Sequence, residues 1–350
     1  MNKERNILQL INIYRSAIMG FAALWILIHH EWLPLTPEGT VLFRLENYIC
    51  DTGFIGVDIF LLISGMGLYY AIQKHDIKTF YKRRFIRILP ALLIMAVIMA
   101  LIDGWSLQQF ICNITGINFY KRNTFLFLWY GIAIIQIYLV FPLYYKLFSK
   151  AKNKKSFTLL AILIWTIFVL VFVDLERIDL LTFTNRIPIF LIGVLFGWME
   201  RNEKVQLNKC DWILCFIVFT IGLFLEFLLS GSWGMLHAIG TGLPAVIECI
   251  PLVLILAKLF ELIITYLKRF SDVITKLFTL IGAVSFELYC VQEWIGNKIQ
   301  QKMIGNYSNL TINIVKFFII FLCCVMLYLL SRFIKSIVGR INKNYVKTLE

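Results

Sequence analysis

Long apolar runs separated by short polar stretches dominate this chain. A membrane-spanning helix needs about 20 mostly apolar residues, and runs near that length recur from one end to the other. The pattern predicts an all-α polytopic membrane bundle, and we expect one integral-membrane domain over residues 1–350. The ten predicted spans are residues 12–32, 53–73, 88–102, 124–147, 156–173, 186–200, 211–230, 242–264, 275–297 and 311–334.

Composition and charge agree with this topology. The chain is 60% hydrophobic and 16% charged, whereas a globular protein has about a quarter charged residues. With the N-terminus inside, most lysines and arginines fall on the cytoplasmic side, and the few outside include Arg186, Lys298 and Lys316. This bias predicts a multi-pass protein of the cell membrane with both termini cytoplasmic. It also explains the net charge of +13 without a nucleic-acid partner.

Three simpler features concern metal binding and helix packing. No CxxC or His–Cys spacing occurs, so we expect no metal site. Gly193 and Gly197 form a GxxxG pair, which predicts close helix packing. Ser64 also lies beside a glycine in a span, and a packing role is favoured there over a nucleophilic one.

Ionisable side chains inside spans are costly and therefore mark candidate functional positions. These positions are His29, His30, Asp58, Glu226, Glu248 and Glu287. In this topology most of them lie in the outer half of the bilayer. The inner end of the third span instead carries a dense basic cluster, which consists of Lys82, Arg83, Arg84 and Arg87. The chain is thus polarised, with acids and imidazoles outward and anion-binding groups inward.

Two interpretations fit His30. As a general base, its imidazole would deprotonate a hydroxyl that attacks an acyl carbon, with Asp58 orienting the ring. As an interfacial residue, it would simply face lipid headgroups. For Asp58 the alternative is a helix N-terminal charge that the macrodipole stabilises.

The basic cluster also has two interpretations. Arg84 and Arg87 are three residues apart, so both guanidinium groups lie on one helical face and suit phosphate oxygens. The alternative is an ordinary inner-face anchor that touches anionic lipid.

The stretch from Gly53 to Pro90 resembles the acyltransferase-3 family of integral-membrane acyltransferases. The family pattern is a G-x-x-G-V-D-x-F span with a later S-G, followed by a basic R-x-x-R turn before a proline. The matching positions here are Gly53, Gly56, Val57, Asp58, Phe60, Ser64, Gly65, Arg84, Arg87 and Pro90.

The first span extends the resemblance and also departs from it. Gly20 to His30 fits the family pattern and places the family histidine at His30, with His29 as the alternative. The family arginine falls on Met19, and Arg15, one turn earlier, is the candidate substitute. A late family motif resembles SFELYCVQ, but its histidine position is Gln292.

The resemblance implies O-acylation, usually O-acetylation, of cell-envelope carbohydrates with acetyl-CoA as the donor. On this hypothesis Arg84 and Arg87, with Arg83 and Arg15, hold the CoA phosphates at the inner side. A helix rise of 1.5 Å per residue separates Arg15 from His30 by about 22 Å, a gap that the pantetheine arm would bridge. His30 is then either the base or a transient acyl carrier.

Two other functions stay open at this point. A proton-coupled carrier or exporter of an anionic or sugar substrate would use His30, Asp58 and the glutamates as a relay. A structural subunit of an envelope assembly would need none of them. The acceptor, be it capsule, exopolysaccharide, lipopolysaccharide or peptidoglycan, and the oligomeric state do not follow from the sequence.

Overall fold

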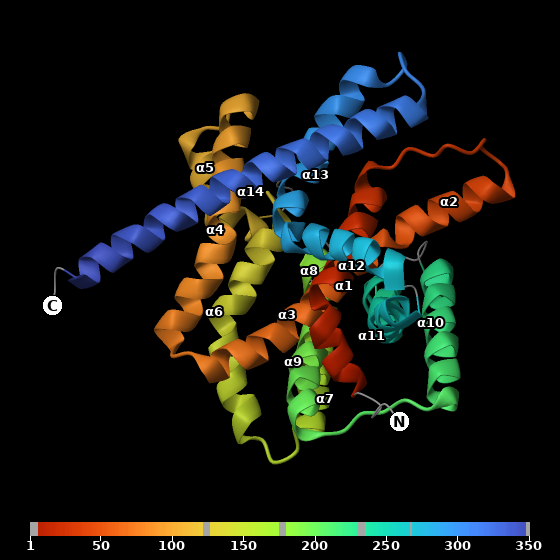
Figure 1. The fold of residues 1–350 in the computed structure, drawn as a ribbon, viewed down its shortest axis with the longest axis vertical. Coiled ribbons are helices and arrows are strands. Elements are labelled where there is room, and N and C mark those ends of the chain that lie inside the picture. Colours follow the sequence, from red (N-terminus) through yellow and green to blue (C-terminus); the bar gives the residue numbers. More distant parts are fainter. Residues whose placement is uncertain (1–5, 122–126, 175–179, 230–234, 267, 348–350) are drawn as a thin grey trace. The chain divides into compact units, whose positions relative to one another are not determined.

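The computed structural model describes residues 6–121, 127–174, 180–229, 235–266 and 268–347. Every regular element in these ranges is a helix (Figure 1). This confirms the all-α fold class. Parts of two predicted spans, residues 124–126 and 230, lie outside the described residues.

Nine of the predicted spans correspond to single helices. These helices are α1 (Ile7–Glu31), α3 (Ile55–Lys74), α4 (Ile77–Asp103), α6 (Trp129–Lys150), α7 (Lys154–Asp174), α9 (Ile187–Asn202), α10 (Lys209–Leu229), α11 (Met235–Tyr266) and α14 (Asn309–Lys347). In the described residues, seven helices are long and apolar enough to cross a membrane, or eight if a broken pair counts as one span. The chain is therefore a multi-pass integral membrane protein. The total of ten spans and the cytoplasmic termini stay predictions.

The predicted span 275–297 is not one continuous helix. Helix α12 (Lys268–Ala283) ends before Val284, and helix α13 (Ser285–Met303) begins after it. Val284 has φ −108° and ψ 13°, outside the helical region. Hydropathy does not register this break because apolar residues lie on both sides of it.

Shorter helices lie in the connections between spans, where hydropathy predicts no helix. They are α2 (Val41–Asp51), η1 (Thr52–Phe54), α5 (Leu107–Ile114), η2 (Ile117–Tyr120) and α8 (Leu181–Thr184). The Thr40 hydroxyl caps α2 by accepting from the Phe43 N–H at 3.1 Å. Ser106 and Gln109 form a reciprocal capping box at the start of α5. Both caps satisfy backbone N–H groups that a helix N-terminus leaves unpaired.

The chain divides into two compact units, each built from separate stretches of sequence. Unit 1 comprises residues 1–26, 54–77 and 137–283, and unit 2 comprises residues 27–53, 78–136 and 284–350. The single membrane domain expected over residues 1–350 stays a prediction.

Small residues bring α3 and α9 together in unit 1. A Cβ atom added to Gly193 would overlap the backbone carbonyl of Leu62, and one added to Gly65 would overlap that of Phe190. Gly197 packs against Tyr69 of the same helix α3. The close packing predicted from the GxxxG pair is thus confirmed, because only glycine lets these two backbones approach so closely.

Candidate active site

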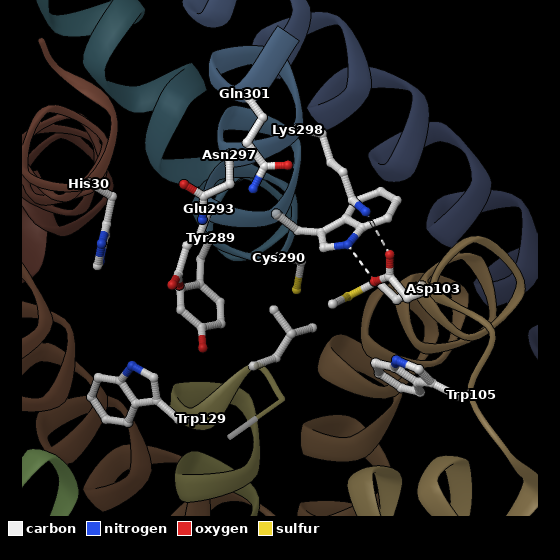
Figure 2. Close-up of a pocket in the computed structure, with 13 residues that line it drawn as sticks. His30, Asp103, Trp105, Trp129, Tyr289, Cys290, Glu293, Asn297, Lys298 and Gln301 are labelled. Carbon is white, nitrogen blue, oxygen red and sulfur yellow. Dashed lines mark hydrogen bonds and ion pairs between the residues drawn. The ribbon is translucent and has the colours of Figure 1, made fainter. Parts of the chain in front are cut away.

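Unit 2 contains a cavity of about 610 Å³ (Figure 2). Its walls come from the end of α1, the end of α4, the start of α6 and one face of α13. The lining residues are His30, Met99, Asp103, Trp105, Leu128, Trp129, Tyr289, Cys290, Glu293, Trp294, Asn297, Lys298 and Gln301. The cavity lining thus combines aromatic and other apolar side chains with several polar groups, as small-molecule sites usually do.

Helix α13 supplies the polar wall because of its spacing. Tyr289, Glu293, Asn297 and Gln301 follow one another at intervals of four, so their side chains share one helical face. The Tyr289 hydroxyl accepts a hydrogen bond of 2.9 Å from the backbone N–H of Tyr130, near the start of α6. A hydroxyl that accepts this bond keeps its own proton for donation. Tyr289 is the tyrosine of the SFELYCVQ motif, but that motif does not predict the polar stripe.

His30 and His29 have different surroundings. The His29 Nδ1–H donates to the Cys50 carbonyl at 2.9 Å, since a carbonyl only accepts. The His30 ring lies edge-on to it, with ring centroids 4.8 Å apart, and His30 lines the cavity. Of the two histidines only His30 lines the cavity, and the catalytic role of either stays a prediction. Two carboxylates, those of Glu293 and Asp103, share the cavity lining with His30.

A buried ion pair follows directly after His30. The Lys316 ammonium lies 2.9 Å from the Glu31 carboxylate and donates to the Gln300 amide oxygen at 2.8 Å. Both charged side chains are only 1% exposed. Gly296 lies against the Glu31 carboxylate, where any added Cβ would overlap it. The pair ties the end of α1 to α13 and α14, and so fixes the backbone next to His30.

This ion pair is not among the sequence-based expectations, which place Lys316 on the outer surface and assign no role to Glu31. A signal was available, because Lys316 lies within the predicted span 311–334, where a charge is costly without a partner.

Asp103, at the end of α4, joins the cavity wall to α13. Its two carboxylate oxygens accept separate bonds of 2.8 Å, from the Trp294 indole N–H and from the Lys298 ammonium. The Lys298 ammonium also lies 5.6 Å from the centre of the Trp294 ring. These contacts hold the Trp294 indole in one orientation. Lys298 had been predicted only as an outer cation.

Asp58 lies in unit 1, in the first turn of α3, and is 1% exposed. Its carboxylate forms an ion pair with Arg186, directly before α9. The Arg186 guanidinium also donates to the Phe54 carbonyl at 3.3 Å and lies 5.4 Å from the Phe54 ring. The expected orientation of His30 by Asp58 stays a prediction. The structure gives Asp58 a partner, Arg186, that the sequence predicts on the outer surface.

The basic cluster lies within α4, which begins at Ile77 rather than after the cluster. Arg83 and Arg87 are exposed, while Arg84 is half-buried and lies 5.8 Å from the Phe80 ring centre. All three guanidinium groups thus belong to unit 2. Arg15 belongs to unit 1, where its guanidinium packs against Gly67. The phosphate-binding role of all four arginines stays a prediction.

A family model described as an acyltransferase domain matches residues 17–329. The chain belongs to the acyltransferase-3 family. This match covers most of the chain, so the resemblance seen between Gly53 and Pro90 extends over the predicted bundle. In the described residues, no three His, Cys, Asp or Glu side chains are grouped so that they could hold a metal ion.

Curated relatives match over shorter stretches. The O-acetyltransferase OatA of Staphylococcus aureus is 28% identical over 136 residues, which is 30% of this chain and 22% of the relative. The peptidoglycan O-acetyltransferase OatA of Listeria monocytogenes is 26% identical over 216 residues, which is 48% of this chain and 35% of the relative. The chain thus matches only about a fifth to a third of the length of these relatives. No solved structure matches the chain.

Proposed function

We propose that this protein is a membrane O-acyltransferase that moves an acetyl group from cytoplasmic acetyl-CoA to a hydroxyl of an envelope glycan. The acceptor would be extracytoplasmic or lipid-linked, as in capsule, exopolysaccharide or peptidoglycan. The observation that carries the proposal is the family match over residues 17–329. The names of the relatives, which are O-acetyltransferases, support acetyl as the group transferred.

His30 is the reacting group in this proposal, because it lines a cavity large enough for a substrate. Its neutral imidazole takes the proton of the acceptor hydroxyl while the oxygen attacks the thioester carbon. The new C–O bond forms, the C–S bond breaks, and the CoA thiolate leaves and is protonated. In the alternative mechanism, the imidazole first attacks the thioester and releases the CoA thiolate, and the acetyl-imidazole then transfers its acetyl group to the hydroxyl.

Asp58 stays in the proposal as the acidic residue of the family motif. Its ion pair with Arg186 holds the start of α3 beside the start of α9. Arg186 is therefore the first residue to alter when the role of Asp58 is tested.

The arginines of α4 are the proposed site for the CoA phosphates. Arg84 and Arg87 project from one helical face, and a guanidinium binds phosphate oxygens through two parallel hydrogen bonds. Arg83 is their neighbour, and Arg15 takes the place of the missing family arginine in the first span. Each such charged hydrogen bond contributes about 1.5–3 kcal/mol.

The test uses the full-length protein in liposomes with acetyl-labelled CoA and an oligosaccharide acceptor. Wild-type protein should form alkali-labile acetyl esters on the sugar. His30→Ala should lower the rate at least about 100-fold, the usual minimum contribution of a general base. His75→Ala is the matched control, because His75 directly follows α3 and is not among the cavity residues.

The same preparation tests donor binding. Arg84→Ala should raise the KM for acetyl-CoA by about 10-fold or more, while Arg84→Lys should recover part of the loss. Transport of the sugar without ester formation would instead favour a carrier. Unchanged transfer by stably inserted His30→Ala and Arg84→Ala proteins would overturn the proposal.

A further inference from the structure

We infer that the cavity beside His30 binds an uncharged pyranose unit of the acceptor, with the sugar ring against tryptophan faces and its polar substituents on α13. This inference rests on the proposed function and names the substrate class for the same cavity. Three observations support it, which are the aromatic walls, the amide side chains and the balance of charge.

The aromatic walls suit a sugar ring. A pyranose has apolar C–H faces and a polar edge, so it needs flat apolar surfaces with hydrogen-bonding groups beside them. Trp105, Trp129 and Trp294 line the cavity from three separate segments of the chain. In the view of Figure 2, Trp105 and Trp129 lie below the cavity. A volume of about 610 Å³ is within the range of small-molecule sites.

Two amide side chains supply the polar edge. Asn297 and Gln301 lie one turn apart on the cavity face of α13, above the cavity in Figure 2. An amide offers both a donor and an acceptor, which matches a hydroxyl or an N-acetyl group. Neither side chain has a hydrogen-bond partner among the described residues. Both are exposed, so both are open to a ligand.

The charges in the cavity disfavour an acidic sugar. Its lining contains two carboxylates, Asp103 and Glu293, and a single ammonium, that of Lys298. Lys298 is already paired with Asp103 at 2.8 Å. A uronate, sulfate or phosphate would therefore meet the like charge of Glu293 without a free counter-charge, and two neighbouring like charges repel each other. The CoA phosphates would meet the same obstacle, which agrees with their proposed site on α4.

Trp294 is prepared for this role by its neighbours. The Asp103 carboxylate holds its indole N–H, and the Lys298 side chain lies over its ring. An aromatic face that is already oriented loses little conformational freedom when a sugar binds. His30 lines the same cavity, so a hydroxyl of the bound ring would lie in the compartment that holds the proposed base.

The experiment measures binding and transfer separately with full-length protein in nanodiscs. Tri-N-acetylchitotriose is the neutral probe and trigalacturonate is the acidic one. Wild-type protein should bind the neutral trimer at least 10-fold more tightly than the acidic one. Trp129→Ala and Asn297→Ala should each raise the acceptor KM about 3- to 10-fold, whereas Trp129→Phe should keep most of the affinity.

Two controls separate binding from folding. The KM for acetyl-CoA should stay unchanged in the Trp129 and Asn297 variants, which shows that they fold. Trp212→Ala, a tryptophan on α10 that does not line the cavity, should leave the acceptor KM unchanged.

Tighter binding of trigalacturonate, or an unaltered acceptor KM in both Trp129→Ala and Asn297→Ala, would overturn the inference while leaving the proposed acetyl transfer intact. Binding of the neutral trimer without any acetyl transfer to it or to other glycans would instead support the cavity assignment and count against the proposed function.

Discussion

The two units each bury an ion pair, but the two pairs have different neighbours. In unit 1 the Asp58–Arg186 pair is enclosed by helix packing, with side chains 1% and 12% exposed. In unit 2 both side chains of the Glu31–Lys316 pair are 1% exposed, yet this pair directly follows a histidine that lines an open cavity. Buried pairs add little net stability, and breaking one is very costly. Both pairs thus join a buried carboxylate to a basic side chain. They differ in the segments that they connect, and this difference decides whether a pair can affect the cavity.

The largest expected effect comes from breaking the pair beside the cavity. Glu31→Gln or Lys316→Met alone leaves a buried group without its partner, so the free energy of unfolding should fall by about 3–5 kcal/mol. The double variant Glu31→Gln/Lys316→Met should recover most of this loss. Thermal unfolding in detergent measures both.

The acceptor KM then shows whether this pair positions the cavity. It should remain several-fold raised in the stable double variant, because the end of α1 is no longer tied to α13. A double variant with both stability and acceptor KM restored would mean that the pair only stabilises. The exposed Lys155–Glu203 pair is the control, and its loss should cost less than about 1 kcal/mol.

The enclosed pair in unit 1 should give a different kinetic pattern. Asp58→Asn removes the partner of Arg186 and should destabilise the protein by about 3 kcal/mol. Adding Arg186→Met should restore the stability. If Asp58 takes part in the reaction, kcat should stay low in the double variant while the acceptor KM is unchanged. Full recovery of kcat would reduce Asp58 to a residue that holds helices together.

A smaller effect is expected from helix packing in unit 1. Gly193→Ala forces a methyl group against the Leu62 carbonyl, so α3 and α9 must separate, at a cost of about 1–3 kcal/mol. Ser64→Ala, next to Gly65 on α3, should change neither stability nor transfer. Loss of transfer in Ser64→Ala would instead favour the alternative role of Ser64 as a nucleophile. Thermal unfolding measures the stability of both variants, and the liposome assay measures their acetyl transfer.

Some of this account could be predicted from sequence because its signals are local. Span length and a short motif indicated the all-helical membrane fold, the family and the position of His30. The break at Val284 was missed because hydropathy is continuous across it. The partners of Glu31 and Asp58 were missed for another reason. Lys316 and Arg186 are distant in the chain, and only tertiary packing brings them close.

The cavity could not be predicted from the sequence either. The spacing of Tyr289, Glu293, Asn297 and Gln301 is visible in the sequence, but it does not reveal which helices face that stripe. Trp129 and His30 come from other helices and complete the site. Their assembly is what turns a helix with several polar residues into a candidate substrate site.

The most direct test of the central claim is the acetyl content of envelope glycans in cells that make this protein. Nuclear magnetic resonance of purified surface glycans, recorded with and without alkali treatment, detects O-acetyl esters. We expect these esters in cells with the wild-type protein and their loss in cells with equal amounts of membrane-inserted His30→Ala protein. Equal ester content in the two strains, or none in either, would contradict the account.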